Sequence, residues 1–140
     1  PVARDLLDGF GEVAIAITAP DGTVTGWCVL VAARPEQRAR GLMEVTDLGG
    51  YAGMLFVYDD DATGGYYMRN TPMPLRIGWF TAEGDLVTTR DMAPCDDVAD
   101  CPTYHPDGAY RFALEVPSAE ARRVGVVEGS RLAVGGACAA

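Results

Sequence analysis

The strongest constraint on the fold is a succession of short apolar runs, rich in β-branched residues, that are separated by turn residues. The first two runs are residues 12–18 (EVAIAIT) and 23–33 (TVTGWCVLVAA), and between them lies Ala-Pro-Asp-Gly. Two such runs joined by an Asp-Gly turn predict a β-hairpin. The chain therefore starts as a β protein.

Further runs of the same kind follow along the 140 residues. Together with the first two they give eight expected strands, at residues 12–18, 23–33, 54–58, 66–70, 75–81, 86–92, 110–116 and 131–134. Many short strands with frequent turns favour a sandwich or a closed sheet. We expect a mainly β fold, a compact single domain that is β-sandwich-like, jelly-roll-like or barrel-like.

Two short helices interrupt the strands. Residues 35–42 (PEQRARGL) have proline in the first turn and Gly41 near the end, which is typical of a helix. Residues 117–124 begin with Ser118, which we predict to be the N-cap of a second helix. Residues 1–11 are expected to form a poorly ordered N-terminal arm, and residues 12–140 the single domain.

The charge balance excludes several kinds of partner. The net charge is −9 at pH 7, and all eleven cationic residues are arginines without a basic stripe. Nucleic acid and anionic membrane surfaces both require clustered positive charge. We therefore expect neither as a partner, and the lack of a long apolar run predicts that this segment does not insert into a membrane.

The four cysteines indicate an oxidising compartment. Cys95 and Cys101 lie in a turn-rich loop, PCDDVADCP, which suits a disulfide that staples the loop, and Cys28 and Cys138 could form a second one. The alternative is four free thiols in a cytosolic protein. The chain begins at proline without methionine, which fits a processed mature domain or a fragment of an exported protein. We expect an extracellular or cell-envelope location.

Several short motifs follow one another along the chain, at Arg40-Gly41-Leu42-Met43, Gly53-Met54-Leu55-Phe56, Tyr67-Met68-Arg69-Asn70-Thr71 and Pro74-Leu75. In order and spacing they resemble the motifs of the domain-of-unknown-function 192 (DUF192) family, and the resemblance covers roughly residues 28 to 134. The resemblance implies a compact sandwich or jelly-roll fold, often in exported proteins, and no established activity. This sequence has Tyr67, Arg69 and Arg76 where the family usually has tryptophan, lysine and aspartate. Any acid–base or metal-binding role of that aspartate is lost here.

The candidate binding site lies around Met68-Arg69-Asn70-Thr71. In a strand, Met68 and Asn70 would share one face while Tyr67 and Thr71 share the other. One interpretation is a pocket in which Arg40 and Asn70 orient a polar ligand near Tyr67, Met68 and Thr71. The alternative is a structural role, in which Asn70 holds the following turn by bonding to backbone amides.

Other site chemistries rest on weaker patterns. The tyrosines and Trp79 could stack on sugar rings, although Trp79 sits in an apolar run that is typical of a core. Calcium is a candidate cofactor, with possible ligands at Asp59-Asp60-Asp61 or at Asp96-Asp97 with Asp100. The five methionines could bind Cu(I), but core packing accounts for them as well.

Catalytic patterns are weak, and no residue is assigned a catalytic role. A carboxylate pair such as Glu115 with Asp91 could act as in a glycosidase, but nothing in the sequence fixes their separation. The leading hypothesis is an exported, monomeric binding or accessory domain for a small polar ligand or saccharide. The alternatives are a carboxylate-based hydrolase and a structural or assembly module that recognises another protein.

Overall fold

The computed structural model describes residues 3–139, which hold nine strands, two α-helices and one 3-10 turn. Short runs of alternating or continuous apolar residues form the strands, as their composition predicts. In chain order the elements are β1 (Gly11–Thr18), β2 (Val24–Ala32), α1 (Pro35–Arg40), β3 (Met54–Ala62), β4 (Tyr66–Tyr67), β5 (Leu75–Phe80), β6 (Leu86–Met92), β7 (Thr103–Tyr104), β8 (Tyr110–Pro117), η1 (Ser118–Glu120), α2 (Ala121–Val124) and β9 (Arg131–Val134).

Seven of these strands form one sheet in the order β6-β5-β8-β3-β2-β1-β9, and β4 pairs with β7 in a separate two-stranded sheet. Within the large sheet, only β2 and β3 pair in parallel; their connection contains α1 and a loop. The other neighbours are antiparallel. The expectation of a mainly β, single compact domain is confirmed.

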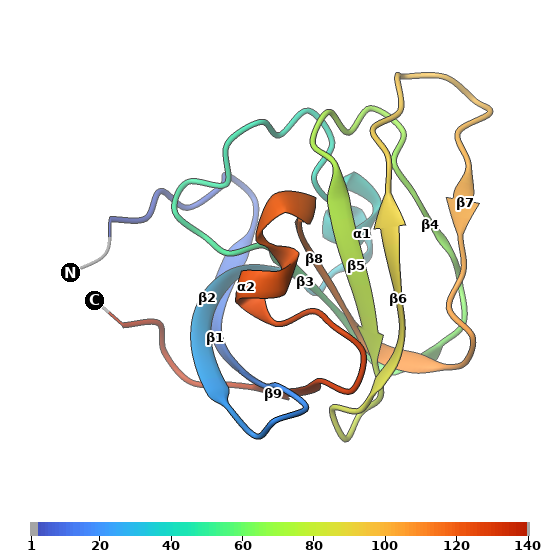
Figure 1. Ribbon diagram of the computed structural model, residues 1–140. Coiled ribbons are helices and arrows are strands. Elements are labelled where there is room, and N and C mark those ends of the chain that lie inside the picture. Colours follow the sequence, from blue (N-terminus) through green and yellow to red (C-terminus); the bar gives the residue numbers. More distant parts are fainter. Residues whose placement is uncertain (1–2, 140) are drawn as a thin grey trace.

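The large sheet curls until its two edges meet at one end. The amide of Leu132, in β9, donates to the carbonyl oxygen of Gly84 at 2.8 Å, and Asp85 forms an antiparallel bridge with Arg131. Figure 1 shows β9 and the turn between β5 and β6 approaching each other at the bottom of the molecule. Of the expected architectures, the barrel-like one describes this sheet best.

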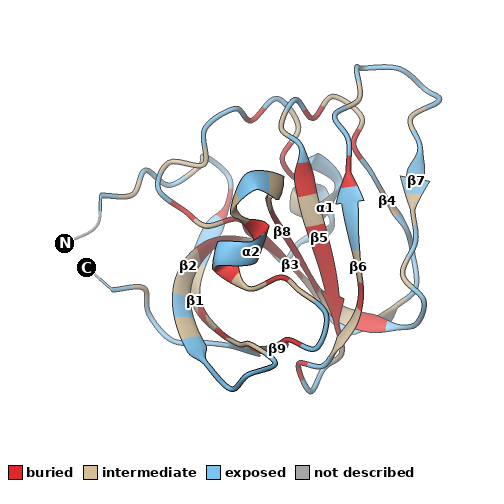
Figure 2. Ribbon diagram, viewed as in Figure 1, coloured by how far each residue is buried: buried red, intermediate tan, exposed pale blue. Residues whose placement is uncertain are grey.

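Both faces of the sheet are covered, by different elements (Figure 1). On one side, here called the α2 face, Ala121 and Val124 of α2 pack with Leu55 and Leu114 of the sheet. The opposite side, the α1 face, carries a second core beneath α1, the loop that follows it, and the β4–β7 pair. Figure 2 shows buried residues concentrated along β3, β5 and β8. The first half of β3 and most of β5 and β8 are buried in this way, whereas the outer half of β3 carries the exposed residues Asp59, Asp60 and Asp61.

Two local predictions are wrong for identifiable reasons. The run at residues 66–70 is a strand only at Tyr66–Tyr67, because Asn70 adopts a left-handed conformation with φ of 56°. Ser118 does not cap a helix: Pro117 occupies the N-cap position of the 3-10 turn, without a side-chain hydrogen bond. The short strand β7, shortly after Cys101, was not among the eight expected strands.

The expected N-terminal arm lies partly on the domain. The Phe10 side chain is buried in the core of the α1 face, and the amide of Asp5 donates to the carbonyl oxygen of Gly49 at 2.8 Å. The domain boundary expected at residue 11 therefore falls after a core residue. Residues 1–2 of the arm and residue 140 of the domain lie outside the described residues.

Both expected disulfides are present. Cys95 and Cys101 are joined across a separation of six residues, and Cys28 and Cys138 across 110, with Cα–Cα distances of 6.1 and 5.5 Å. Two disulfides are typical of proteins from an oxidising environment. In the described part of the chain, no helix is long and apolar enough to traverse a lipid bilayer.

The closure of the sheet predicts a large cost for Gly84→Ala. Gly84 has φ of 90°, and a Cβ there would overlap the carbonyl oxygen of Leu132, so β9 would have to move away. Gly22 has nearly the same φ, 91°, with open space around it, and is the matched control. Gly22→Ala should lower the free energy of unfolding by about 1 kcal/mol, and Gly84→Ala by about 3 kcal/mol. Equal losses in urea unfolding would contradict closure at this point.

Candidate functional site

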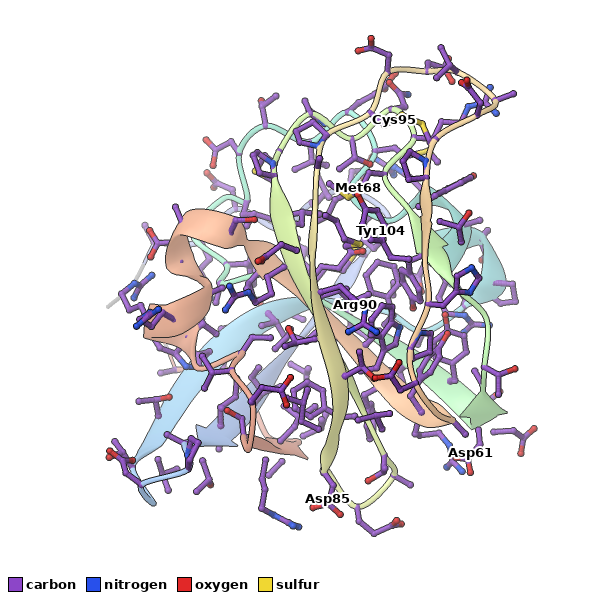
Figure 3. The ribbon with its side chains drawn as sticks, turned by 45° about the vertical axis from the view of Figure 1, so that its right-hand side comes forward. Asp61, Met68, Asp85, Arg90, Cys95 and Tyr104 are labelled. Carbon is purple, nitrogen blue, oxygen red and sulfur yellow. A yellow bond between two sulfur atoms is a disulfide. The ribbon has the colours of Figure 1, made fainter. Side chains whose placement is uncertain are left out.

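A pocket of about 270 Å³ opens on the α1 face. It lies between α1, the outer half of β3, the β4–β7 pair and the floor provided by β8. In Figure 3, Met68 lies inside the molecule beneath the loop that carries Cys95. The residues that line the pocket are Arg38, Ala39, Arg40, Gly41, Leu42, Met43, Phe56, Tyr58, Gly65, Tyr66, Tyr67, Met68, Thr71, Thr103 and Glu115.

The floor of the pocket carries a carboxyl group. Along β8 the side chains alternate between the faces, so Glu115 shares the α1 face with Ala113 while Leu114 packs on the other side. Its cross-strand neighbours are Met54 of β3 and Ile77 of β5, both buried in the α1-face core. Glu115 is only 4% exposed, yet it lines the pocket, so its accessible part faces the pocket.

No side chain or backbone group within residues 3–139 compensates this carboxyl. Burial is the one cause that shifts its pKa, with no hydrogen bond or nearby cation opposing it, and it raises the pKa from 4.5 to about 8. At pH 7 Glu115 is therefore mostly a neutral acid, able to donate one hydrogen bond and accept others. The indole N–H of Trp79, on the same face, is fully buried without a partner among the described residues, whereas the Glu115 side chain keeps a small exposed part at the pocket.

Aromatic side chains form one wall of the pocket. The hydroxyls of Tyr58 and Tyr66 are 2.6 Å apart, and the ring of Tyr66 packs edge-on against Phe56 and Trp79, at centroid distances of 5.1 and 6.0 Å. Burial raises the pKa of Tyr66 far above its usual range, so the phenol stays neutral. The wall is mainly apolar, and its polar atoms largely satisfy one another.

The rim of the pocket carries two arginines from α1. Arg38 donates through Nη1 to the carbonyl oxygen of Val57 at 3.0 Å, and its guanidinium lies 4.6 Å from the ring centroid of Tyr58. Arg40 donates to the carbonyl oxygen of Asp8 at 3.0 Å, with its guanidinium 5.2 Å from the ring centroid of Phe10. Both residues line the pocket. These contacts direct the Arg38 guanidinium toward β3 and that of Arg40 toward residues 8–10.

Four of the five residues predicted from the sequence meet at this pocket. Arg40, Tyr67, Met68 and Thr71 all line it. Tyr67 is 48% exposed, whereas Met68 and Thr71 are buried. The structure brings these residues together, and that they bind a ligand stays a prediction.

Asn70 does not face this pocket, because the strand that would have aligned it with Met68 has already ended. Its Nδ2 donates to Glu44 Oε1 at 3.3 Å, its amide donates to the carbonyl oxygen of Asp96, and its own carbonyl accepts from the amide of Glu44. These contacts fasten the turn to two neighbouring loops. The side chain thus has a structural contact, but with the Glu44 carboxylate and not with the backbone amides that were expected, and Asn70 lines a separate, more polar hollow.

The structure does not bring together Glu115 and Asp91, the carboxylate pair that the sequence left as a possibility. Arg76 and Asp91 are cross-strand neighbours on β5 and β6, and the Arg76 Nε lies 2.8 Å from Asp91 Oδ1. Arg76 alternates with Leu75 and Ile77, which pack on the α1 face, so this ion pair lies on the opposite face from Glu115. The hydrogen bond from Arg76 holds the pKa of Asp91 below its usual range.

The acidic turns considered for calcium are partly neutralised by arginine. Asp61 accepts from Arg111 at 2.9 Å, and Asp97 accepts from Arg69 at the same distance. Asp61 lies at the periphery of the molecule in Figure 3. Among the described residues, the grouping of potential metal ligands within 4.8 Å of one another is Glu12 with the disulfide-bonded Cys28 and Cys138. Calcium binding stays a prediction from the sequence.

Sequence reasoning did not assign Glu115, Arg38 or Tyr66 to the pocket. A signal for Glu115 was present: a single acid stands in an otherwise apolar stretch, ALEV, of a strand. A strand that is covered on both faces has an almost continuous apolar sequence, so a lone acid within it marks either an edge position or a buried charge. Arg38 and Tyr66 had no comparable signal, because their positions depend on how α1 and β4 fold over the sheet.

The sequence matches the model of the DUF192 family, described as "Uncharacterized ACR", over residues 16–134. No curated protein matches the chain.

Two solved structures are similar to this one. A protein from Sinorhizobium meliloti 1021, described as a "putative transcription regulator", has a TM-score of 0.78 and 23% identity, covering 89% of this chain and 95% of that protein. A protein of unknown function from Novosphingobium aromaticivorans DSM 12444 has the same TM-score and 24% identity, covering 95% and 92%. At these identities the likeness establishes the fold alone.

The burial of Glu115 predicts a specific dependence of stability on pH. Unfolded, the side chain ionises near pH 4.5, and folded near pH 8, so the folded state holds an extra proton between those values. The free energy of unfolding should therefore fall as the pH rises through this window, by up to roughly 1.4 kcal/mol per pH unit, and then level off.

Glu115→Gln should remove that part of the pH dependence, since the amide cannot ionise. Urea unfolding of both proteins at pH 5, 7 and 9 measures this effect. The free energy of unfolding of the variant, relative to that of the wild type, should rise by a few kcal/mol between pH 5 and 9. Other titrating groups are common to both proteins and cancel in the difference. A difference that does not change with pH would show that Glu115 ionises normally in the folded protein.

Proposed function

This chain belongs to the DUF192 family, and from that premise we propose that it is a binding module that takes a small polar ligand into the pocket above Glu115. The family description, "Uncharacterized ACR", assigns no activity, so the proposal rests on the chemistry of the pocket itself. In this proposal the module acts as a monomer. Its location is extracellular or in the cell envelope, and the two disulfides support that location.

The observation that carries the proposal is the carboxyl of Glu115, buried on the pocket floor with no partner within residues 3–139. Holding a carboxyl in so little contact with water costs stability, and the same desolvation raises its pKa. A hydrophobic residue at this position would avoid that cost, as it does at the neighbouring Leu114 and Val116. A ligand that donates to the carboxyl would recover it, and the apolar walls would bind the rest of the ligand.

Other functions have less support. Hydrolysis by two carboxylates needs a facing pair across a cleft, whereas Glu115 is the one acidic residue among those that line this pocket. A protein-recognition surface would need a contiguous apolar patch. The large exposed apolar side chains of the described residues are scattered, at Leu6, Val24, Tyr67, Val98 and Val134. Nucleic acid is disfavoured by the net charge of −9.

Saccharide binding is the narrower form of the hypothesis. Sugar rings stack on exposed aromatic faces, but Trp79 is 0% exposed and Tyr110 is also buried. Tyr67 is the large exposed aromatic ring at the pocket. The arrangement suits a compact ligand that inserts toward Glu115 better than one that lies flat across a platform.

A thermal-shift screen of small polar compounds tests the proposal. The panel holds sugars, polyols, amino acids, amines and carboxylates, together with calcium. A ligand at one hundred times its Kd stabilises the native state by about 2.7 kcal/mol, which raises the Tm by several degrees. Glu115→Gln should abolish or strongly reduce this rise, because the ligand loses its contact at the floor.

Glu128→Gln is the matched control, since it makes the same chemical change at an exposed position outside the pocket. It should leave the rise in Tm intact. If every compound that stabilises the wild type stabilises Glu115→Gln equally, the ligand does not use this pocket floor and the proposal fails.

A further inference from the structure

The arginines at the pocket mouth differ from most others in the chain. Seven of the eleven arginines form ion pairs with carboxylates. Within residues 3–139, Arg38 and Arg40 pair with no carboxylate, although the protein carries a net charge of −9. Their guanidinium groups are oriented by carbonyl oxygens and aromatic rings, none of which neutralises the charge.

The pocket therefore has two chemically opposite ends. Two unneutralised guanidinium groups lie at the rim, and one uncompensated carboxyl lies on the floor. The side chains between them, including Phe56 and Met68, are largely apolar. A ligand that complements the rim offers an anion, and guanidinium is well suited to bind a carboxylate through paired N–H groups.

We propose that the ligand is amphoteric, an amino acid or a close derivative, whose ammonium group binds Glu115 and whose carboxylate binds Arg38, with Arg40 adding positive charge at the rim. This inference rests on the proposed function, because it names the class of ligand for the same pocket. It also assigns a role to Arg38, which the sequence did not point to.

An ammonium group suits the floor better than a neutral donor does. A hydroxyl can hydrogen-bond to the neutral acid but supplies no charge to stabilise the carboxylate. An ammonium at hydrogen-bond distance favours the ionised carboxyl, and in a pocket shielded from water the pair attracts strongly. On binding at neutral pH, Glu115 releases its proton to solvent and the ammonium keeps its own, so one negative and one positive charge face each other on the pocket floor.

The rim makes a simple amine an incomplete ligand. An amine would leave both guanidinium groups without an anion, and its own charge would pass two positive groups on the way in. A simple carboxylate would satisfy the rim but leave Glu115 without a partner. A molecule with both groups satisfies both ends, and its two charges are each met by one of opposite sign.

The experiment measures binding by isothermal titration calorimetry with matched probes. These are L-amino acids and the straight-chain ω-amino acids from glycine to 6-aminohexanoate, each compared with the amine and the carboxylate of the same chain length. The best amphoteric probe should bind at least about tenfold more tightly than either partner compound, since each lacks one charge-assisted contact. The ω-amino acid series also measures the spacing between the two ends of the pocket.

Variants separate the two ends. In Glu115→Gln, the amphoteric probe should bind no more tightly than the matched carboxylate. In the double variant Arg38→Gln with Arg40→Gln, it should bind no more tightly than the matched amine. Arg122→Gln, at an exposed arginine elsewhere, is the control and should change neither. In the wild type, affinity should rise about tenfold per pH unit from pH 6 and level off near pH 8, with proton release seen as a buffer-dependent heat.

Any other outcome overturns the inference, but the outcomes differ in whether they also contradict the proposed function. If amine and amino acid bind equally, or if only polyols or sugars bind through Glu115, the ligand is not amphoteric but the proposed binding function stands. If no probe in either the calorimetric or the thermal-shift panel binds in a manner that depends on Glu115, both the inference and the proposed function fail.

Discussion

The position of β8 between β3 and β5, with both faces covered, determines nearly everything about the site. Because its side chains alternate between two closed cores, Glu115 has no route to solvent except through the pocket. A carboxyl on an edge strand would be hydrated and unremarkable. The same group on this central strand is held as a neutral acid at pH 7 by the cost of desolvation.

The elements that cover the α1 face give the pocket its shape. Helix α1 ends at Gly41, where φ of 49° and the absence of a Cβ let the chain turn against the ring of Phe56. Leu42 then enters the core while Arg38 and Arg40 remain at the rim. On the other side, Tyr66 belongs to the two-stranded sheet β4–β7, where it pairs with Tyr104, and the Cys95–Cys101 disulfide closes the loop that precedes β7.

Much of the fold could be predicted from the sequence, because strand periodicity and turn residues are local signals. The β1–β2 hairpin, β6 and β9 follow directly from them. The site could be predicted only in part. Arg40, Tyr67, Met68 and Thr71 belong to motifs, but the left-handed backbone at Asn70 and the meeting of α1 with β8 depend on tertiary packing. Glu115 looked like one of many acids until its neighbours were known.

The most direct test is a nuclear magnetic resonance titration of the Glu115 side-chain carboxyl carbon in the unliganded protein, assigned by comparison with Glu115→Gln. If the carboxyl is buried without a partner, its chemical shift should titrate with a pKa of about 8. A pKa near the ordinary value of 4.5 would mean that water or a protein group already stabilises the carboxylate. That result would contradict the account, since the pocket floor would then hold no unsatisfied group for a ligand to meet.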